Sequence, residues 1–168
     1  MHIVLVAAVT ANGFIARSTN ELADWTSKED KKFFVEETKK HGVMIMGRTT
    51  FATIGKPLPG RRIVVLTEKP EEVQVVEGSV ETASGDLKTI IDGLSKRGYA
   101  SCVIAGGSNV YSQFLNAGLV NELALTFEPV MFTSGVRLAE KLERELQLEV
   151  KSVEKLGENA ILARYSVH

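Results

Sequence analysis

Runs of Val, Ile and Leu recur at short intervals along the chain, and each is bounded by Gly, Pro or charged residues. The earlier runs carry apolar residues at consecutive positions, which is typical of strands buried on both faces in a sheet covered by helices. The pattern predicts strands at Ile3–Val9, Val43–Met46, Ile63–Leu66, Val73–Val76 and Cys102–Ala105.

Helical spacing of apolar residues appears between these strands. The stretch Ser27–Lys40 opens with a capping serine and an acidic first turn, and it stops before Gly42. Asp86–Arg97 opens with a capping aspartate, carries leucine and isoleucine along one face, and ends at Gly98. A further helix is predicted at Ser108–Leu115, directly after a pair of glycines.

The last third of the chain alternates polar with apolar residues, which is typical of antiparallel strands. Strands are predicted at Asn121–Glu128, Leu146–Glu154 and Ala160–Val167, with a turn at Gly157–Asn159 between the last two. We therefore expect one α/β domain over residues 1–168. Its three layers would hold a mixed, mainly parallel sheet, flanked by helices and ending in an antiparallel C-terminal hairpin. Ligands of such sheets bind beyond the carboxyl ends of the strands.

Composition narrows the class of protein. The 168 residues are 44% hydrophobic and 24% charged, and the net charge is −1, so no broad field would attract nucleic acid or an anionic membrane. Cys102 is the single cysteine and lies in an apolar run, so we expect it to be buried and unreactive. The apolar start Met1–Ala8 is too short to span a bilayer and lacks a cationic leader, which favours a cytoplasmic protein. No metal is expected, and nothing specifies an oligomeric state.

Two stretches place glycines where a strand ends and a helix begins. Gly47–Thr50 offers backbone N–H groups, an arginine and two hydroxyls, which together suit a phosphate. In Ala105–Asn109 the glycines would let backbone approach a pyrophosphate without a Cβ in the way. Taken singly, each is equally compatible with a capped helix or a tight turn. The spacing does not match the G-x-G-x-x-G fingerprint, so no Rossmann site is inferred.

Two further features suit an organic substrate. The stiff turn Pro57–Arg62 delivers a basic pair at the start of a strand, where an arginine could capture a carboxylate or merely be solvated. Asp30 lies in the first turn of a helix, where an acid is stabilised by the helix dipole whether or not it has a function. Aromatic neighbours at Trp25, Phe33 and Phe34 favour a carboxylate in an apolar pocket, suited to binding an amidine-like ring edge.

Taken together, these stretches resemble dihydrofolate reductase, and the resemblance covers nearly the whole chain. The residues that carry it are Val6–Ala8, Trp25 with Asp30 and Phe34, Met46–Thr50, Ile54–Arg61, Gly106–Tyr111 and Leu125–Thr126. Ile54–Arg61 combined with Gly47–Thr50 is highly specific, while the glycine pair and the first strand are shared with other reductases. The resemblance implies a dihydrofolate-reductase-like fold and NADPH-dependent reduction of 7,8-dihydrofolate to tetrahydrofolate. A hydride would go to pterin C6, and water would deliver the proton to N5.

The resemblance also implies roles for individual residues. Asp30 would grip the amino and ring nitrogens of the pterin, Thr126 would hydrogen-bond the same carboxylate, and Arg61 would hold the glutamate α-carboxylate. The implied catalytic residues are Asp30, Trp25 and Thr126. The implied substrate-binding residues are Val6, Ala7, Asp30, Phe34, Ile54, Leu58, Arg61 and Thr126. The implied cofactor-binding residues are Ala8, Ile15, Gly47, Arg48, Thr49, Thr50, Leu66, Thr67, Lys69, Ala105, Gly106, Gly107, Ser108, Asn109, Val110 and Tyr111.

Departures from this pattern keep two other functions open. The segment Arg17–Asp24 is longer than the usual catalytic loop and lacks its Met-Pro pair, and Asn12–Ala16 looks more like the related reductase domain of riboflavin biosynthesis. That domain would reduce a pyrimidine ribosyl phosphate. A non-catalytic nucleotide-binding module is the third possibility. Glu68, next to the expected 2′-phosphate position, disfavours that anion unless Lys69 and Arg48 outweigh it, so we expect measurable activity with NADH.

Overall fold

The computed structural model describes residues 1–21 and 23–168. Leu22, within the Arg17–Asp24 segment, lies outside the described residues. The large sheet consists of β1 (His2–Thr10), β3 (Val43–Gly47), β4 (Arg62–Leu66), β5 (Val80–Ala83), β6 (Ser101–Ile104), β7 (Glu122–Glu128), β9 (Leu148–Leu156) and β10 (Ala160–Val167). The helices are α1 (Lys28–His41), α2 (Arg48–Ile54), the short 3-10 helix η1 (Pro70–Glu72), α3 (Leu87–Lys96) and α4 (Ser108–Asn116).

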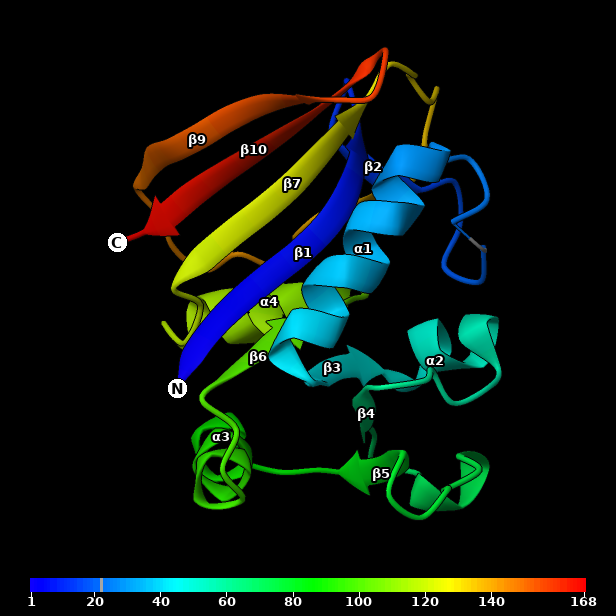
Figure 1. Ribbon diagram of the computed structural model, residues 1–168, viewed down its shortest axis with the longest axis vertical. Coiled ribbons are helices and arrows are strands. Elements are labelled where there is room, and N and C mark those ends of the chain that lie inside the picture. The colour runs from blue at the N-terminus through cyan, green and yellow to red at the C-terminus, as the bar shows by residue number, and fades with distance from the viewer. Residues whose placement is uncertain (22) are drawn as a thin grey trace.

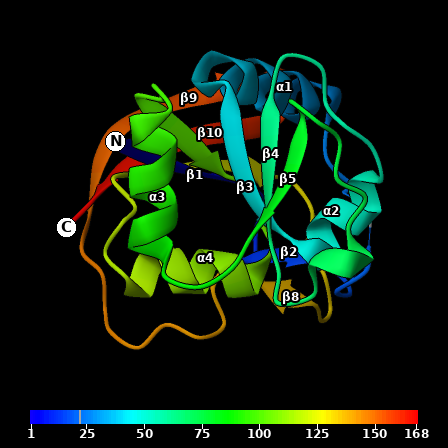
Figure 2. The ribbon, with the colours of Figure 1, turned by 90° about the horizontal axis from the view of Figure 1, so that it is seen from below.

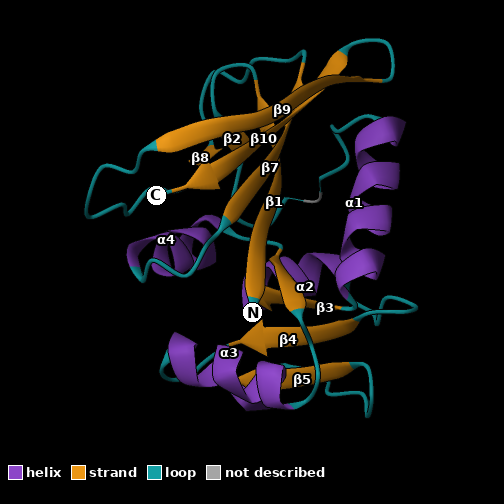
Figure 3. Ribbon diagram, turned by 60° about the vertical axis from the view of Figure 1, so that its left-hand side comes forward, coloured by secondary structure: helices purple, strands orange, loops and turns teal. Residues whose placement is uncertain are grey.

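The sheet has eight strands in the order β5-β4-β3-β6-β1-β7-β10-β9. Pairs from β5 to β7 are parallel, and β10 runs antiparallel to both β7 and β9. Figure 1 shows the twist of this sheet, and Figure 3 shows β5 and β9 at its two edges. The predicted mixed sheet with an antiparallel C-terminal hairpin is confirmed.

Helices cover the sheet on both faces. Phe33 of α1 and Phe51 of α2 join the core on one face, while Ile91 of α3 and Phe114 of α4 join the core on the other. Figure 2 shows α1 and α4 on opposite sides of the strands. This arrangement buries both faces of the central strands, which explains why their sequences are apolar at consecutive positions.

The predicted helix boundaries are confirmed to within a residue or two. Ser27 caps α1 by accepting a hydrogen bond from the backbone N–H of Asp30, and Asp86 caps α3 in the same way from Thr89. Gly42 ends α1 in the left-handed conformation, with φ of 73°, where a side chain would be strained. The first turn of α1, which carries Asp30, is therefore held by a specific cap.

The strand predicted at Val73–Val76 is wrong. The N–H of Val73 donates to the carbonyl of Pro70, which closes the turn of η1, and the next strand begins only at Val80. Val73 is still buried, so its apolar character reflects packing and not strand pairing. The sequence also did not predict a small two-stranded sheet of β2 (Phe14–Ala16) and β8 (Val136–Arg137), whose strands are too short to show a period.

Cys102 is fully buried in β6, as expected, and this burial raises the pKa of its thiol to about 12.

Among the described residues, no helix is both long enough and apolar enough to cross a membrane.

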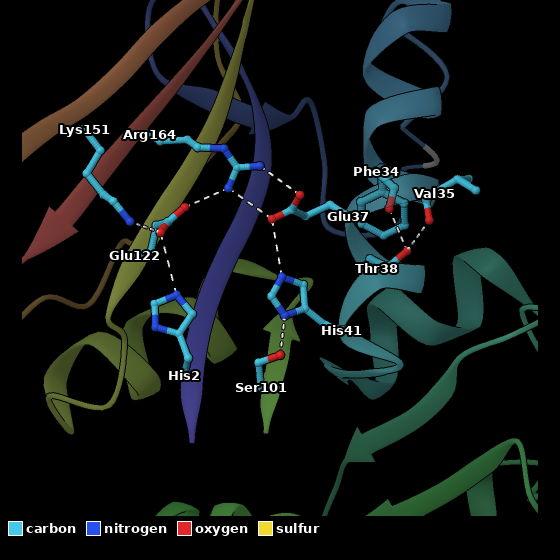
Figure 4. A network of polar contacts seen from close by, with 10 residues as sticks. All are labelled: His2, Phe34, Val35, Glu37, Thr38, His41, Ser101, Glu122, Lys151 and Arg164. Atoms are coloured by element: carbon cyan, nitrogen blue, oxygen red, sulfur yellow. Dashed lines mark hydrogen bonds and ion pairs between the residues drawn. The ribbon is translucent and has the colours of Figure 1, made fainter. Parts of the chain in front are cut away.

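A network of charged side chains joins α1 to the last strands (Figure 4). The guanidinium of Arg164 on β10 contacts Glu37 of α1 at 2.8 Å and Glu122 of β7 at 2.7 Å. Lys151 of β9 also pairs with Glu122, and the ring of His41 lies 3.4 Å from Glu37. Both carboxylates are buried, so this network fastens α1 to the antiparallel part of the sheet.

Candidate active site

A cavity of about 1000 Å³ opens where the parallel strands end. Its walls come from the carboxyl-terminal parts of β1, β3, β4 and β5, from the segment after β6, and from the starts of α1, α2 and α4. Strand order brings these ends together, because neighbouring parallel strands finish at the same edge of the sheet.

Nearly all the predicted site residues line this cavity. They are Val6, Ala7, Ala8, Ile15, Trp25, Asp30, Phe34, Gly47, Arg48, Thr49, Thr50, Ile54, Leu58, Arg61, Leu66, Thr67, Ala105, Gly106, Gly107, Ser108, Asn109, Val110 and Tyr111. Thr126 and Lys69 do not line it. Thr126 is buried on β7 beside Ala8, and Lys69 pairs with Glu72 at 3.0 Å.

Asp30 lines the cavity from the first turn of α1 and is itself only 8% exposed. Burial raises the pKa of its carboxyl above the ordinary value, and the negative charge of Glu128 acts in the same direction. The nearby hydroxyls of Thr126 and Thr26 and the charge of Lys31 oppose this rise. Asp30 is thus a desolvated acid with polar neighbours, a group suited to binding a cationic or amidine-like ring edge.

Two buried polar atoms lack a hydrogen-bond partner among the described residues, namely Nε1 of Trp25 and Oγ1 of Thr126. Thr126 is close enough to lower the pKa of Asp30, yet its hydroxyl does not meet standard hydrogen-bond geometry. The Trp25 ring packs edge-on against Phe132, with 5.1 Å between ring centroids. Trp25 lines the cavity, and buried donors are nearly always paired, so its N–H is a candidate donor to a bound ligand.

The glycines at the strand ends allow close approach around Thr50. A Cβ added to Gly107 would lie 3.1 Å from Oγ1 of Thr50, and one added to Gly106 would lie 3.4 Å from the Tyr111 hydroxyl oxygen. The N–H of Gly47 donates to the carbonyl of Gly106 at 2.9 Å, which ties the two glycine turns together. The two glycine turns, packed against Thr50 and Tyr111, form a backbone-lined cradle that could hold a pyrophosphate group.

The cationic side of this cradle is partly neutralised. Arg48 forms an ion pair with Glu72, which also contacts Lys69. A hydrogen bond from Lys69, together with the charges of Arg48 and Lys69, lowers the pKa of the Glu72 carboxyl. Glu68 lines the cavity nearby. Sequence reasoning identified Glu68 but missed Glu72, because η1 brings it back onto Arg48 only in the folded chain.

Arg61 also lines the cavity, as do the apolar residues Ile54 and Leu58. Its Nη1 donates to the Thr38 hydroxyl at 3.1 Å and its Nε donates to the carbonyl of Pro59 at 3.2 Å. Burial lowers the pKa of the guanidinium from its ordinary value. These two bonds orient the side chain and leave other N–H donors of the guanidinium for a ligand.

Comparisons with known proteins identify the family of this chain. The family model for dihydrofolate reductase matches residues 2–153. The chain is 36% identical over 126 residues to dihydrofolate reductase HdrB of Haloferax volcanii, a match that covers 71% of this chain and 63% of that protein's length. The chain thus spans less than two thirds of this relative.

Two solved structures share the fold. A putative riboflavin biosynthesis protein from Shewanella sp. PV-4 superposes with a TM-score of 0.84 at 24% identity, covering 100% of this chain and 99% of that one. Dihydrofolate reductase from Enterococcus faecalis, complexed with NADP(H), superposes with a TM-score of 0.73 at 24% identity, covering 99% and 96%. On the strength of the family match, this chain belongs to the dihydrofolate reductase family.

Proposed function

We propose that this chain reduces 7,8-dihydrofolate to tetrahydrofolate with NADPH. The observation that carries the proposal is that one cavity is lined by the buried Asp30, by the apolar side chains of Phe34, Ile54 and Leu58, and by Arg61. A pterin has a polar edge that a carboxylate can hold, and folate ends in a carboxylate that an arginine can hold. The two charged residues therefore match the two ends of one substrate.

The cofactor would occupy the other part of the cavity. Gly106, Gly107 and Thr50 would hold the pyrophosphate, Arg48 the adenosine side, and Ala8 and Tyr111 would border the nicotinamide. When bound, the nicotinamide supplies a hydride that goes to pterin C6. The Tyr111 hydroxyl donates to the carbonyl of Val6 at 2.7 Å, and this bond fixes the ring at the cavity wall.

The chain's own residues would orient the pterin and favour its protonation. Asp30, as an anion, would hold the amino and ring nitrogens and stabilise positive charge that develops when N5 gains a proton. Asp30 would face the opposite edge of the ring from N5, so a water would deliver that proton. The N–H of Trp25, which has no partner among the described residues, is a donor that could hold such a water.

The decisive measurement is the oxidation of NADPH with and without dihydrofolate. We expect turnover that depends on dihydrofolate. Turnover with a pyrimidine ribosyl phosphate instead would identify the chain as a riboflavin-pathway type of reductase. Cofactor binding without turnover of either substrate would identify a nucleotide-binding module. Either result would overturn the proposal.

The ion pair between Arg48 and Glu72 predicts a weak preference for NADPH over NADH. Arg48→Ala should raise the KM for NADPH much more than the KM for dihydrofolate, because the guanidinium would contact only the cofactor. Glu72→Gln should raise the ratio of kcat/KM for NADPH to that for NADH by about three- to tenfold, since a competing negative charge is removed. The gain should shrink at high salt.

Glu71→Gln is the matched control, because Glu71 lies in the same 3-10 helix and makes no ion pair within the described part of the chain. A wild-type preference for NADPH above about a thousandfold, roughly 4 kcal/mol, would contradict the claim that Glu68 and Glu72 weaken binding of the 2′-phosphate. So would a Glu72→Gln variant whose cofactor preference matches that of Glu71→Gln.

We expect Arg61 to bind the glutamate carboxylate of dihydrofolate. Arg61→Lys should weaken dihydrofolate binding by about 1–3 kcal/mol, because a lysine cannot make the two-pronged contact with a carboxylate. Dissociation constants from fluorescence titration would measure the loss. A pterin without the glutamate tail is the control and should bind both proteins alike. Equal losses for both ligands would show that Arg61 supports the turn through Thr38 and Pro59 instead.

A further inference from the structure

Glu128 is a second buried carboxylate near Asp30, and the proposed reaction does not use it. It ends β7, is 4% exposed, and does not line the cavity. Its Oε1 accepts two hydrogen bonds from Ser27, one from the backbone N–H at 2.9 Å and one from the hydroxyl at 2.7 Å. No cationic side chain among residues 1–21 and 23–168 forms an ion pair with it. A buried carboxylate without a cation at this position needs an explanation.

Ser27 connects this carboxylate to the helix that carries Asp30. The Ser27 hydroxyl has one proton, and it donates that proton to Glu128. Its oxygen then accepts the backbone N–H of Asp30, at 3.1 Å. Two hydrogen bonds in series therefore run from the end of β7, through the cap of α1, to the backbone of Asp30. This chain of contacts sets where the first turn of α1 lies relative to the sheet, and hence where the Asp30 side chain enters the cavity.

Stability alone does not account for the carboxylate. Even a buried ion pair can often be replaced by well-packed apolar residues with no loss of stability, so stability does not by itself require a charged group at Glu128. Its charge also affects the site, because it contributes to raising the pKa of Asp30. The other charged or titratable groups that act on Asp30 are Lys31 on α1 and Tyr111 on α4, which is sensitive to the charge of Asp30.

We propose that Glu128 is a positioning residue of this active site, which holds the first turn of α1 through Ser27 so that Asp30 meets the substrate in the productive geometry. The inference rests on the proposed role of Asp30 in the reductase reaction. A carboxylate is suited to this task because one oxygen can accept both donors of Ser27. The effect on catalysis would come through Asp30, since Glu128 itself does not reach the cavity.

The test compares two substitutions that separate hydrogen bonding from charge. Glu128→Gln keeps an acceptor oxygen for Ser27, so single-turnover hydride transfer should stay within about threefold of wild type. Glu128→Leu removes the acceptor, so the rate should fall about tenfold or more, because small displacements of a catalytic group are costly. Ser27→Ala removes the connection from the other side and should slow the same step, which keeps the test valid if Glu128→Leu fails to fold.

Glu122→Gln is the matched control. Glu122 lies on the same strand and is 5% exposed, but it contacts Arg164 and Lys151 away from the cavity. Its replacement should lower thermal stability and leave the single-turnover rate unchanged. A structural role for Glu128 would give the same pattern. Wild-type rates in both Glu128→Leu and Ser27→Ala, or a Glu128→Gln variant as slow as Glu128→Leu, would overturn the proposal.

A readout independent of activity separates this inference from the proposed function. The aspartates of the chain are Asp24, Asp30, Asp86 and Asp92, so the carboxyl carbon of Asp30 can be followed by NMR with labelled aspartate. Its titration midpoint should fall in Glu128→Gln, because a negative neighbour is removed, and it should not move in Glu122→Gln. If the midpoint of Asp30 does not move in Glu128→Gln, the inference that Glu128 acts on Asp30 is overturned, even if the protein reduces dihydrofolate. A shifted midpoint in a protein that does not reduce dihydrofolate would overturn only the proposed function.

Discussion

Replacing Asp30 by asparagine is expected to slow hydride transfer at neutral pH by at least about a hundredfold, equal to some 2.7 kcal/mol of activation free energy. The amide keeps the shape of the side chain and part of its hydrogen bonding. It loses the negative charge that would hold the pterin and favour a proton on N5. Because Asp30 is buried, little solvent is present to compensate for the loss of that charge.

The pH profile of Asp30→Asn distinguishes catalysis from helix stabilisation. As pH falls, a growing fraction of dihydrofolate is already protonated at N5, so the rate of the variant should rise toward acid pH. Wild type should depart from this profile because its buried carboxyl, whose pKa is raised by desolvation, is itself protonated as pH falls. Single-turnover measurements from pH 5 to 8 would show the difference.

Asp86→Asn is the control for a capping role, because Asp86 caps α3 and does not itself line the cavity. That change should lower the melting temperature and leave the rate and its pH dependence as in wild type. If Asp30→Asn behaves like Asp86→Asn, with near wild-type rates at pH 7, then Asp30 is not catalytic and the proposed function loses its main support.

The parts of the fold that follow from local sequence could be predicted. Ser27, Gly42 and Asp86 mark helix ends because capping and left-handed backbone depend on residues a few positions apart. The cavity could be predicted for a related reason. The stretches after β3 and β6 carry glycines, and parallel strands bring such stretches to one edge of the sheet.

The contacts that could not be predicted join residues that are far apart in the chain. Ser27 and Glu128 are 101 positions apart, and Glu37 and Arg164 are 127 apart. Neither pair has a local pattern, since each charged residue alone looks like part of a solvated surface. At Val73 the local signal was misleading, because an apolar residue packs into the core equally well from a 3-10 turn and from a strand.

The buried network around Arg164 carries the largest expected effect on stability. Arg164→Leu should lower the free energy of unfolding at pH 7 by about 3–5 kcal/mol, because it leaves the buried Glu37 carboxylate without its main partner. In a chain of this size that corresponds to a drop in Tm of roughly 6–20 °C. Denaturant unfolding and thermal scans would measure both quantities.

The stability lost in Arg164→Leu should depend on pH, because it depends on the ionisation of Glu37. Burial alone would raise the pKa of its carboxyl, but hydrogen bonds from His41 and Arg164 and the charge of Arg164 lower it to about 2, from 4.5 in the unfolded chain. A depressed pKa contributes stability that is fully present above pH 4.5 and is lost as pH falls toward 2. Without Arg164 most of that contribution is missing. The difference in free energy of unfolding between wild type and Arg164→Leu should therefore become smaller as pH falls from 5 to 3.

The double variant Arg164→Leu/Glu37→Leu tests whether the unpaired charge is the cause. It should be more stable at pH 7 than Arg164→Leu alone, because it no longer buries a lone carboxylate at Glu37, while Glu122 keeps its contact with Lys151. A stability loss in Arg164→Leu that stays constant from pH 7 to pH 3 would point instead to lost packing of the arginine against Phe33, whose ring centroid lies 5.4 Å from the guanidinium carbon. In that case the double variant should be less stable than the single one, because it loses further contacts without relieving any charge.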